Sequence, residues 1–183
     1  MTGSALLPRF SPRIRVARPQ VLYALVRLQD ACFSVAWSRK SFEAYLTGNP
    51  FSRVLVVPHP DGNDASFPLI AYLACWLVFE ELRFLNLAVD AAFRRQGLAK
   101  TLISQAIQLG LENGCKRGLL EVRASNHNAR NLYQSLHFKE YARRKFYYTN
   151  PSEDAILMSL ESLPSSSKHE GSRGHRGGKN IAK

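Results

Sequence analysis

Hydrophobic and polar positions divide the chain into short apolar segments of two kinds. Continuous or alternating apolar runs, which are typical of strands, lie at 14–17, 54–57, 69–79, 81–89 and 119–122, and from about 138 and 155. Apolar residues recur every three to four positions, as in helices, over about 19–33, 38–48, 98–114 and 126–136. Several strands followed by alternating strands and helices predict an α/β (α+β) fold with a mixed sheet covered by helices.

Cap and turn residues set the expected ends of these elements. Ser38 and Asn126 have side-chain oxygens that can cap the helices that follow them, and Gly114 can close the helix that begins near Leu98. The segment 58–64 is rich in Pro, Asp, Asn and Gly, which predicts a turn that joins two strands as a hairpin.

The composition indicates one water-soluble domain. The chain has 183 residues, of which 45% are hydrophobic, and this is enough for a continuous core. No apolar run approaches the roughly 20 residues needed to cross a bilayer, so we expect no membrane partner. Cys32, Cys75 and Cys115 lack paired spacing, which disfavours disulfides and a zinc site and favours a metal-free protein of the reducing cytoplasm.

Positive charge is concentrated in part at the two ends of the chain. The formal net charge is +11, and the Ser/Gly/Lys/Arg-rich end predicts a division into a flexible N-terminus (1–12), a folded domain (13–162) and a disordered basic tail (163–183). The tail is interpreted either as a weak contact for ribosomal RNA or as a solubilising extension. The basic, acid-poor N-terminus also leaves an organelle transit peptide open.

The most specific local feature is a basic loop between a strand that ends at Val89 and a helix that begins near Leu98. A helix start presents unpaired backbone N–H groups and a partial positive charge, which together favour phosphate. Small residues allow a pyrophosphate to approach the backbone, and cationic side chains add charge. The predicted anion-binding residues are Arg94, Arg95, Gln96, Gly97, Leu98, Ala99 and Lys100. Neither a P-loop nor a dinucleotide-binding pattern is present.

The pattern Arg94-x-x-Gly97-x-Ala99 after a strand resembles the coenzyme A signature of the GNAT superfamily of N-acetyltransferases. The segments 36–42, 84–90, 120–126, 131–138, 147–148 and 153–158 resemble the RimI branch of that superfamily, so the match covers about 14–161. The resemblance implies the GNAT acyltransferase fold, a central mixed, mostly antiparallel sheet flanked by about four helices. It also implies acetyl-CoA as cosubstrate and the N-terminal alanine of ribosomal protein S18 as acceptor.

The resemblance also assigns roles to individual residues. The backbone of Leu87, Ala88 and Val89 would bind the pantetheine arm, and Asn126, a helix cap by its position, would contact the cofactor. Glu121 aligns with the family's proton acceptor and Tyr133 with its proton donor. The transfer would then be a direct reaction in a ternary complex, without an acyl-enzyme.

The residues themselves allow other interpretations of this catalytic pair. Glu121 lies within an apolar strand, where desolvation would raise its pKa, but it could instead pair with Arg123 or another cation at a sheet surface. Tyr133 could be a core residue on an amphipathic helix. His137 stands where the family commonly has glycine, so we expect a strained left-handed helix end there rather than a catalytic histidine.

Acceptor binding is less well determined. Trp37, Tyr147 and Tyr148 are candidates to line a peptide groove, although each could be a packing residue. Acetylation of a lysine or a small amine is an alternative activity, and a GNAT-fold module that binds ribosomal RNA is an alternative of another class. The oligomeric state stays unassigned.

Overall fold

The computed structural model describes residues 12–35, 37–60 and 68–164. Most of the predicted N-terminal segment and of the basic tail, and part of the turn at 58–64, lie outside the described residues. Leu163, which we assigned to the tail, is 5% exposed, and its N–H donates to the carbonyl of Lys116. The folded part therefore extends past 162, because this apolar side chain completes the core.

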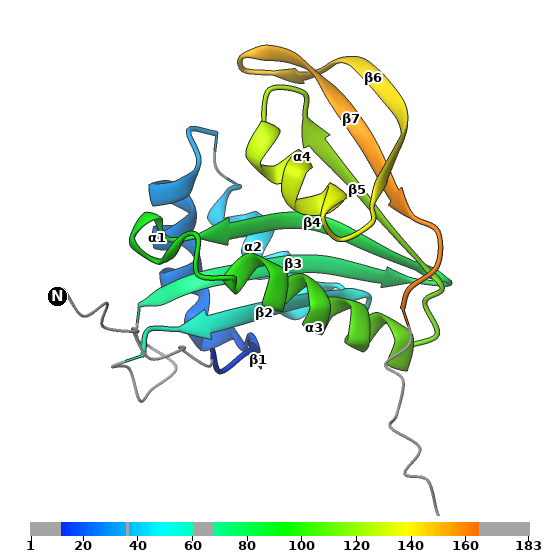
Figure 1. The fold of residues 1–183 in the computed structure, drawn as a ribbon. Coiled ribbons are helices and arrows are strands. Elements are labelled where there is room, and N and C mark those ends of the chain that lie inside the picture. The colour runs from blue at the N-terminus through cyan, green and yellow to red at the C-terminus, as the bar shows by residue number, and fades with distance from the viewer. Residues whose placement is uncertain (1–11, 36, 61–67, 165–183) are drawn as a thin grey trace, which may run out of the picture.

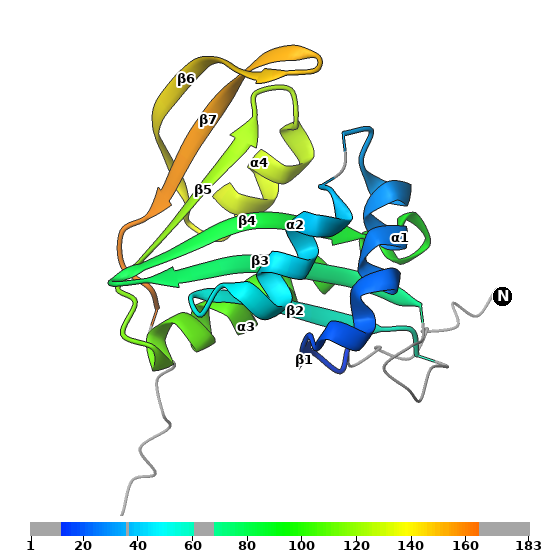
Figure 2. The same cartoon turned by 180° about the vertical axis from the view of Figure 1, so that it is seen from behind.

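Seven strands form one twisted sheet in the order β1-β2-β3-β4-β5-β7-β6 (Figures 1 and 2). They are β1 (Arg15–Val16), β2 (Ser52–Pro58), β3 (Leu69–Val78), β4 (Glu81–Val89), β5 (Arg117–Arg123), β6 (Lys139–Thr149) and β7 (Ser152–Leu160). The β4–β5 pair is parallel and the other neighbours are antiparallel. The predicted mixed, mostly antiparallel sheet is confirmed, including the hairpin of β2 and β3.

Helices cover both faces of the sheet. They are α1 (Leu22–Cys32), α2 (Arg39–Glu43, continued by a π-helical turn, Ala44–Gly48), α3 (Leu98–Glu112) and α4 (His127–Gln134), with short 3-10 turns at Pro19–Val21 and Ala91–Phe93. The helices α3 and α4 share a core with one face, and α1 and α2 share a second core with the other face. Each amphipathic stripe predicted from the sequence therefore has a sheet face to cover.

The predicted caps are present. The Ser38 hydroxyl accepts a hydrogen bond from the Ser41 N–H at 3.1 Å, and the Asn126 side chain accepts one from the Ala129 N–H at 3.1 Å. Gly114 has φ 81, as a left-handed helix end requires. The last helix ends at Gln134, two residues before the predicted Leu136, because the chain turns there to enter β6.

The strands β4 and β5 pair over only part of their length. Their register runs from Glu81 opposite Arg117 to Phe84 opposite Leu120, and β5 then continues beside β7 alone. A bulge in the β3–β4 ladder falls at the same place, since Cys75 pairs with Phe84 and Ala74 with Asn86. Bulges bend a strand and increase its twist. The carboxyl end of β4 thus leaves β5, which gives it a free edge.

Candidate active site

Leu87, Ala88 and Val89 lie on this free edge of β4. The Asp90 N–H donates to the Ile70 carbonyl at 2.8 Å, so Asp90 and, by alternation along the strand, Ala88 direct their backbone groups toward β3. Leu87 and Val89 therefore direct theirs to the opposite side, where no described strand pairs with them. The edge offers backbone donors and acceptors to an extended ligand.

The loop that follows β4 brings an open helix start beside that edge. Gly97 has φ 84 and precedes α3, and an added Cβ there would meet no heavy atom within 4 Å. The Thr101 N–H donates to the Gly97 carbonyl at 3.0 Å, which leaves the N–H groups of the first helical turn without an intrahelical acceptor. A phosphate can therefore reach the backbone here.

The basic side chains of the loop add charge without internal neutralisation. Arg94, Arg95 and Lys100 are exposed, and among the described residues none of them forms an ion pair. Arg94 donates through Nε to the Val89 carbonyl at 3.0 Å, which fixes the loop against the end of β4. Gln96 contacts only the Ala92 carbonyl among its described partners, at 3.4 Å. The donor set fits a pyrophosphate group.

A hydrogen-bonded helix end holds Tyr133 on α4. The Phe138 N–H donates to the Tyr133 carbonyl at 3.1 Å, and the His137 N–H donates to the Gln134 carbonyl at 2.9 Å, the two bonds of a Schellman motif. His137 has φ 68, as expected for a residue that replaces glycine at this position. The Phe138 ring packs against the Tyr133 ring, 5.7 Å between centroids. Tyr133 is therefore firmly placed despite the strained residue that follows it.

Burial changes the acidity of Tyr133. Desolvation raises the pKa of its phenol to about 12, with a smaller contribution from Tyr148, whose own pKa burial also raises to about 12. Tyr133 packs among Leu120, Val122 and Phe138 in the core between the sheet and α4. At neutral pH the hydroxyl is thus fully protonated and can act as a donor. The burial of Tyr133 agrees with the core-packing interpretation, and packing holds the ring in place.

Glu121 differs from the sequence-based expectation. Its neighbours Leu120 and Val122 are buried, but Glu121 points to the opposite face, and 33% of its side chain is exposed. Its Oε1 accepts a hydrogen bond from Nη1 of Arg144 at 2.7 Å. Glu121 thus forms an ion pair at a sheet surface, and the burial that we expected is not present, because no helix of the described residues covers this part of the face.

The partner of Glu121 is not the cation nearest in sequence. Arg123 pairs with Glu153 at 3.3 Å, and Glu153 also accepts a hydrogen bond from the Ser125 backbone, which lowers the pKa of that carboxyl. Arg144 reaches Glu121 from β6, across the intervening β7. Sequence reasoning missed Arg144, since only the tertiary pairing of β5, β7 and β6 brings it to the site.

Of the three aromatic candidates, two lie at this site. The Tyr147 and Tyr148 rings are 5.2 Å apart, and the pKa of Tyr147 is raised foremost by a hydrogen bond with Glu121. Trp37 instead stacks on Tyr45 at 4.7 Å, in the core beneath α1 and α2. The contacts of the described residues therefore group the two tyrosines with Glu121 but do not bring Trp37 to them.

A buried polar network, also missed from the sequence, fixes the segment that contains Trp37. Gln29 is 0% exposed, and its Oε1 accepts from the Tyr72 hydroxyl at 2.8 Å and from Asn86 Nδ2 at 3.0 Å. Its Nε2 donates to the Trp37 carbonyl at 2.8 Å. One amide thus joins α1, β3, β4 and the segment before α2, and its partner Asn86 immediately precedes the free edge at Leu87.

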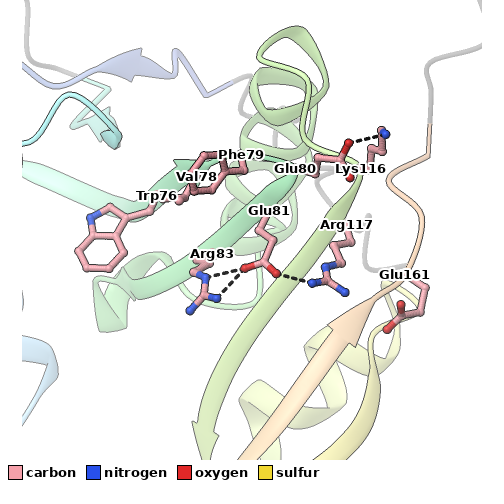
Figure 3. A pocket seen from close by; sticks show the side chains of 9 residues that line it. All are labelled: Trp76, Val78, Phe79, Glu80, Glu81, Arg83, Lys116, Arg117 and Glu161. Carbon is pink, nitrogen blue, oxygen red and sulfur yellow. Dashed lines mark hydrogen bonds and ion pairs between the residues drawn. The ribbon is translucent and has the colours of Figure 1, made fainter.

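A surface cavity of about 850 Å³ lies away from these residues (Figure 3). It surrounds the turn from β3 to β4 and the start of β5, where Glu81 pairs with Arg83 and Arg117. None of the site residues predicted from the sequence lines it. Glu81 and Val89 stand at opposite ends of β4, roughly 25 Å apart at 3.3 Å per residue. This cavity is not part of the candidate site.

Two further observations concern metal binding and membrane-spanning helices. Among the described residues, no group of three or more His, Cys, Asp or Glu side chains is placed to hold a metal ion. No helix in the described ranges combines the length and the apolar character needed to cross a membrane.

Comparison with known proteins agrees with the geometry of the site. The model of the acetyltransferase (GNAT) family matches residues 22–138, more than half of the chain. The chain belongs to the GNAT family. The expected N-acetyltransferase fold and activity class are thereby confirmed, and the basic loop and free β4 edge lie within the matched range.

Individual relatives place the protein within this family. The [ribosomal protein bS18]-alanine N-acetyltransferase of Escherichia coli strain K12 is 34% identical over 141 residues, which are 76% of this chain and 90% of that protein. The crystal structure of the Escherichia coli ribosomal-protein-S18-alanine N-acetyltransferase superimposes with a TM-score of 0.73 at 28% identity, covering 87% of this chain and 99% of the other. Arabidopsis thaliana NAA60 in complex with acetyl-CoA has the same fold, with a TM-score of 0.73 at 18% identity over 82% of this chain and 98% of the other.

Proposed function

We propose that this protein transfers an acetyl group from acetyl-CoA to a protein N-terminal amine, namely that of the alanine that begins ribosomal protein S18. The observation that carries the proposal is the 34% identity over 90% of an Escherichia coli enzyme named for this activity. The parted strands, the open helix start and the Glu121 carboxylate support it, because an acetyltransferase needs a thioester site, a phosphate site and a base.

We assign cofactor binding to two backbone surfaces. The N–H groups at the start of α3 receive the pyrophosphate, with Arg94, Arg95 and Lys100 around it. The backbone groups of Leu87 and the N–H of Val89 hold the pantetheine arm, since the Val89 carbonyl is taken by Arg94, and an N–H there stabilises charge on the thioester oxygen. Asn126, exposed at the start of α4, is assigned a cofactor contact besides its capping role.

Glu121 and Tyr133 then handle the protons. Bound acetyl-CoA supplies a thioester carbonyl that an uncharged amine can attack. Because an α-amino group has a pKa of about 8, Glu121 first accepts a proton from the acceptor's ammonium group. As the N–C bond forms and the C–S bond breaks, the Tyr133 hydroxyl gives its proton to the leaving sulfur. The second proton that the nitrogen loses returns through solvent to Tyr133, and Glu121 releases the first proton to solvent, so the site is restored.

Thiol release against a panel of N-terminal peptides tests this proposal. Removal of a general acid or base costs about 100-fold to 10,000-fold, so we expect Glu121→Gln and Tyr133→Phe each to lower kcat at least about 100-fold. Glu43→Gln removes another exposed, ion-paired glutamate, and Tyr141→Phe another tyrosine, and neither residue belongs to the site. We expect both controls to retain wild-type rates.

The position of the acetyl group decides between acceptors. Mass spectrometry of the products should locate it on the N-terminal nitrogen of a peptide that begins with the S18 sequence. Acetylated lysines beside untouched N-termini would contradict the proposed acceptor. Full turnover by Glu121→Gln and Tyr133→Phe, with loss of biological effect only when residues 164–183 are deleted, would instead favour a binding module.

A further inference from the structure

The carboxylate that we assign as the base already holds a cation. Arg144 Nη1 lies 2.7 Å from Glu121 Oε1, with 54% of the Arg144 side chain and 33% of the Glu121 side chain exposed. The guanidinium of Arg144 and the N-terminal ammonium group of the acceptor are chemically alike, since each is a cationic N–H donor to a carboxylate. The structure therefore shows Glu121 paired with an internal counterpart of the substrate.

The two cations compete for the same oxygen atoms. Proton transfer requires the amine to come within about 2.6–3.2 Å of the carboxylate, directly or through one water. Arg144 already donates to Oε1 of this carboxylate, at 2.7 Å. An ammonium group that takes Oε1 as its acceptor must therefore displace Arg144.

We propose that Arg144 is a resident counter-cation that the acceptor's ammonium group displaces from Glu121, and that it thereby sets the affinity for the acceptor. This inference rests on the proposed function, in which Glu121 is the base. Arg144 is a specificity-determining residue in this role, because a neutral acceptor end cannot replace it at the carboxylate whereas a cationic amine can.

The surroundings of Arg144 allow such an exchange. The residue lies on β6, which is the edge strand of the sheet, next to a register shift between Arg144 and Tyr148. Its guanidinium carbon is 5.4 Å from the centre of the Tyr147 ring. A guanidinium at this distance is attracted by the ring face. Arg144 can thus leave Glu121 and remain beside Tyr147, so displacement does not send the charge into an apolar environment.

The exposure of the pair sets the size of the effect. Ion pairs as accessible as this one are weak, and breaking one changes an equilibrium by about two- to fivefold. The Arg144→Gln variant has no cation to displace, so we expect its acceptor KM to fall by about two- to fivefold. The KM for acetyl-CoA should stay unchanged, because Arg144 contacts none of the residues assigned to the pyrophosphate.

Steady-state kinetics with three variants test the inference. Arg144→Gln removes the competing cation, Arg144→Lys keeps a charge without the planar fork of donors, and Lys145→Gln makes the same charge change at the next residue, which forms no ion pair among the described residues. We expect the acceptor KM to fall for Arg144→Gln and to fall less for Arg144→Lys. For Lys145→Gln, the acceptor KM should change by less than half as much as it does for Arg144→Gln. Thermal melts establish that each variant is folded.

The possible outcomes separate this inference from the proposed function. If the wild-type protein acetylates no N-terminal peptide, both fail. If the wild type is active but Arg144→Gln has an unchanged or higher acceptor KM, only the role of Arg144 is overturned. An equal fall for Arg144→Gln and Lys145→Gln would attribute the effect to overall charge, and it would also overturn displacement at Glu121.

Discussion

The strained residue at the end of α4 provides a sharp test of how Tyr133 is held. His137 has φ 68, and it is exposed, so its imidazole contributes little packing. A left-handed conformation costs an L-residue about 1–2 kcal/mol, whereas glycine adopts it without this cost. Glycine also gives the unfolded chain more freedom, which offsets about 0.4–1 kcal/mol. His137→Gly should therefore stabilise the protein by about 0.7 kcal/mol.

Thermal unfolding measures this difference. For a protein of this size, 1 kcal/mol shifts Tm by about 2–4 °C, so we expect His137→Gly to raise Tm by about 2 °C. His137→Ala is the matched control, because it removes the imidazole but keeps a Cβ at φ 68. We expect the alanine variant to be no more stable than the wild type.

Kinetics of the same variants test the alternative that His137 is catalytic. The two backbone hydrogen bonds of the helix end, at 3.1 and 2.9 Å, do not involve the imidazole. Both variants should therefore keep kcat within about twofold of the wild type. An equal rise in Tm for the alanine and glycine variants would refute the strain argument, and a large loss of turnover in both would identify the imidazole as the functional group.

Two further predictions concern buried polar groups. Gln29→Met leaves the Tyr72 hydroxyl and the Asn86 amide without their shared acceptor, and it should lower the free energy of unfolding, measured by urea denaturation, by about 2–4 kcal/mol. Tyr72→Phe should lower it by about 1 kcal/mol. Equal small losses for the two variants would contradict the network. Burial raises the pKa of Tyr133 from 10.0 to about 12, which corresponds to about 3 kcal/mol of stability contributed by the neutral form. This stability is fully present below pH 10 and is lost as the pH rises from 10 to about 12. Alkaline denaturation curves of the wild type and Tyr133→Phe should therefore diverge only above pH 10.

Much of the fold was predictable because local signals and tertiary packing agree. The strand Glu81–Val89 has the predicted bounds, since the charged Glu80 precedes it and a basic loop follows it. The end of α4 was placed two residues too far, because Ser135 and Leu136 continue the amphipathic pattern and only the reversal at His137 ends it. Leu163 was assigned to the tail because a Ser-rich segment follows it, although its side chain is buried.

The candidate site was predictable where it depends on the backbone and less so where it depends on strand pairing. The open helix start at Gly97 follows from the residues of one loop. The surroundings of Glu121 do not follow from local sequence. Its flanking residues are apolar and face α4, and the sequence pattern does not show which strands lie beside Glu121 on the other face. Arg144 comes from a strand two places away in the sheet, and it lies beyond any local signal.

In the proposed mechanism, the point at which β4 and β5 part lets two residues on opposite faces act on one bond. Tyr133 approaches from the face covered by α4, whereas Glu121 points to the opposite face. A continuous sheet would put hydrogen-bonded backbone between them. The ladder ends at Leu120, the residue immediately before Glu121, and the bulge near Phe84 turns β4 away at the same level. An acetyl group held along the free edge of β4 would thus lie where the two strands part, with Glu121 of β5 on one side of it and Tyr133 of α4 on the other. The register of these strands therefore matters to the proposed chemistry as much as the identity of the two residues.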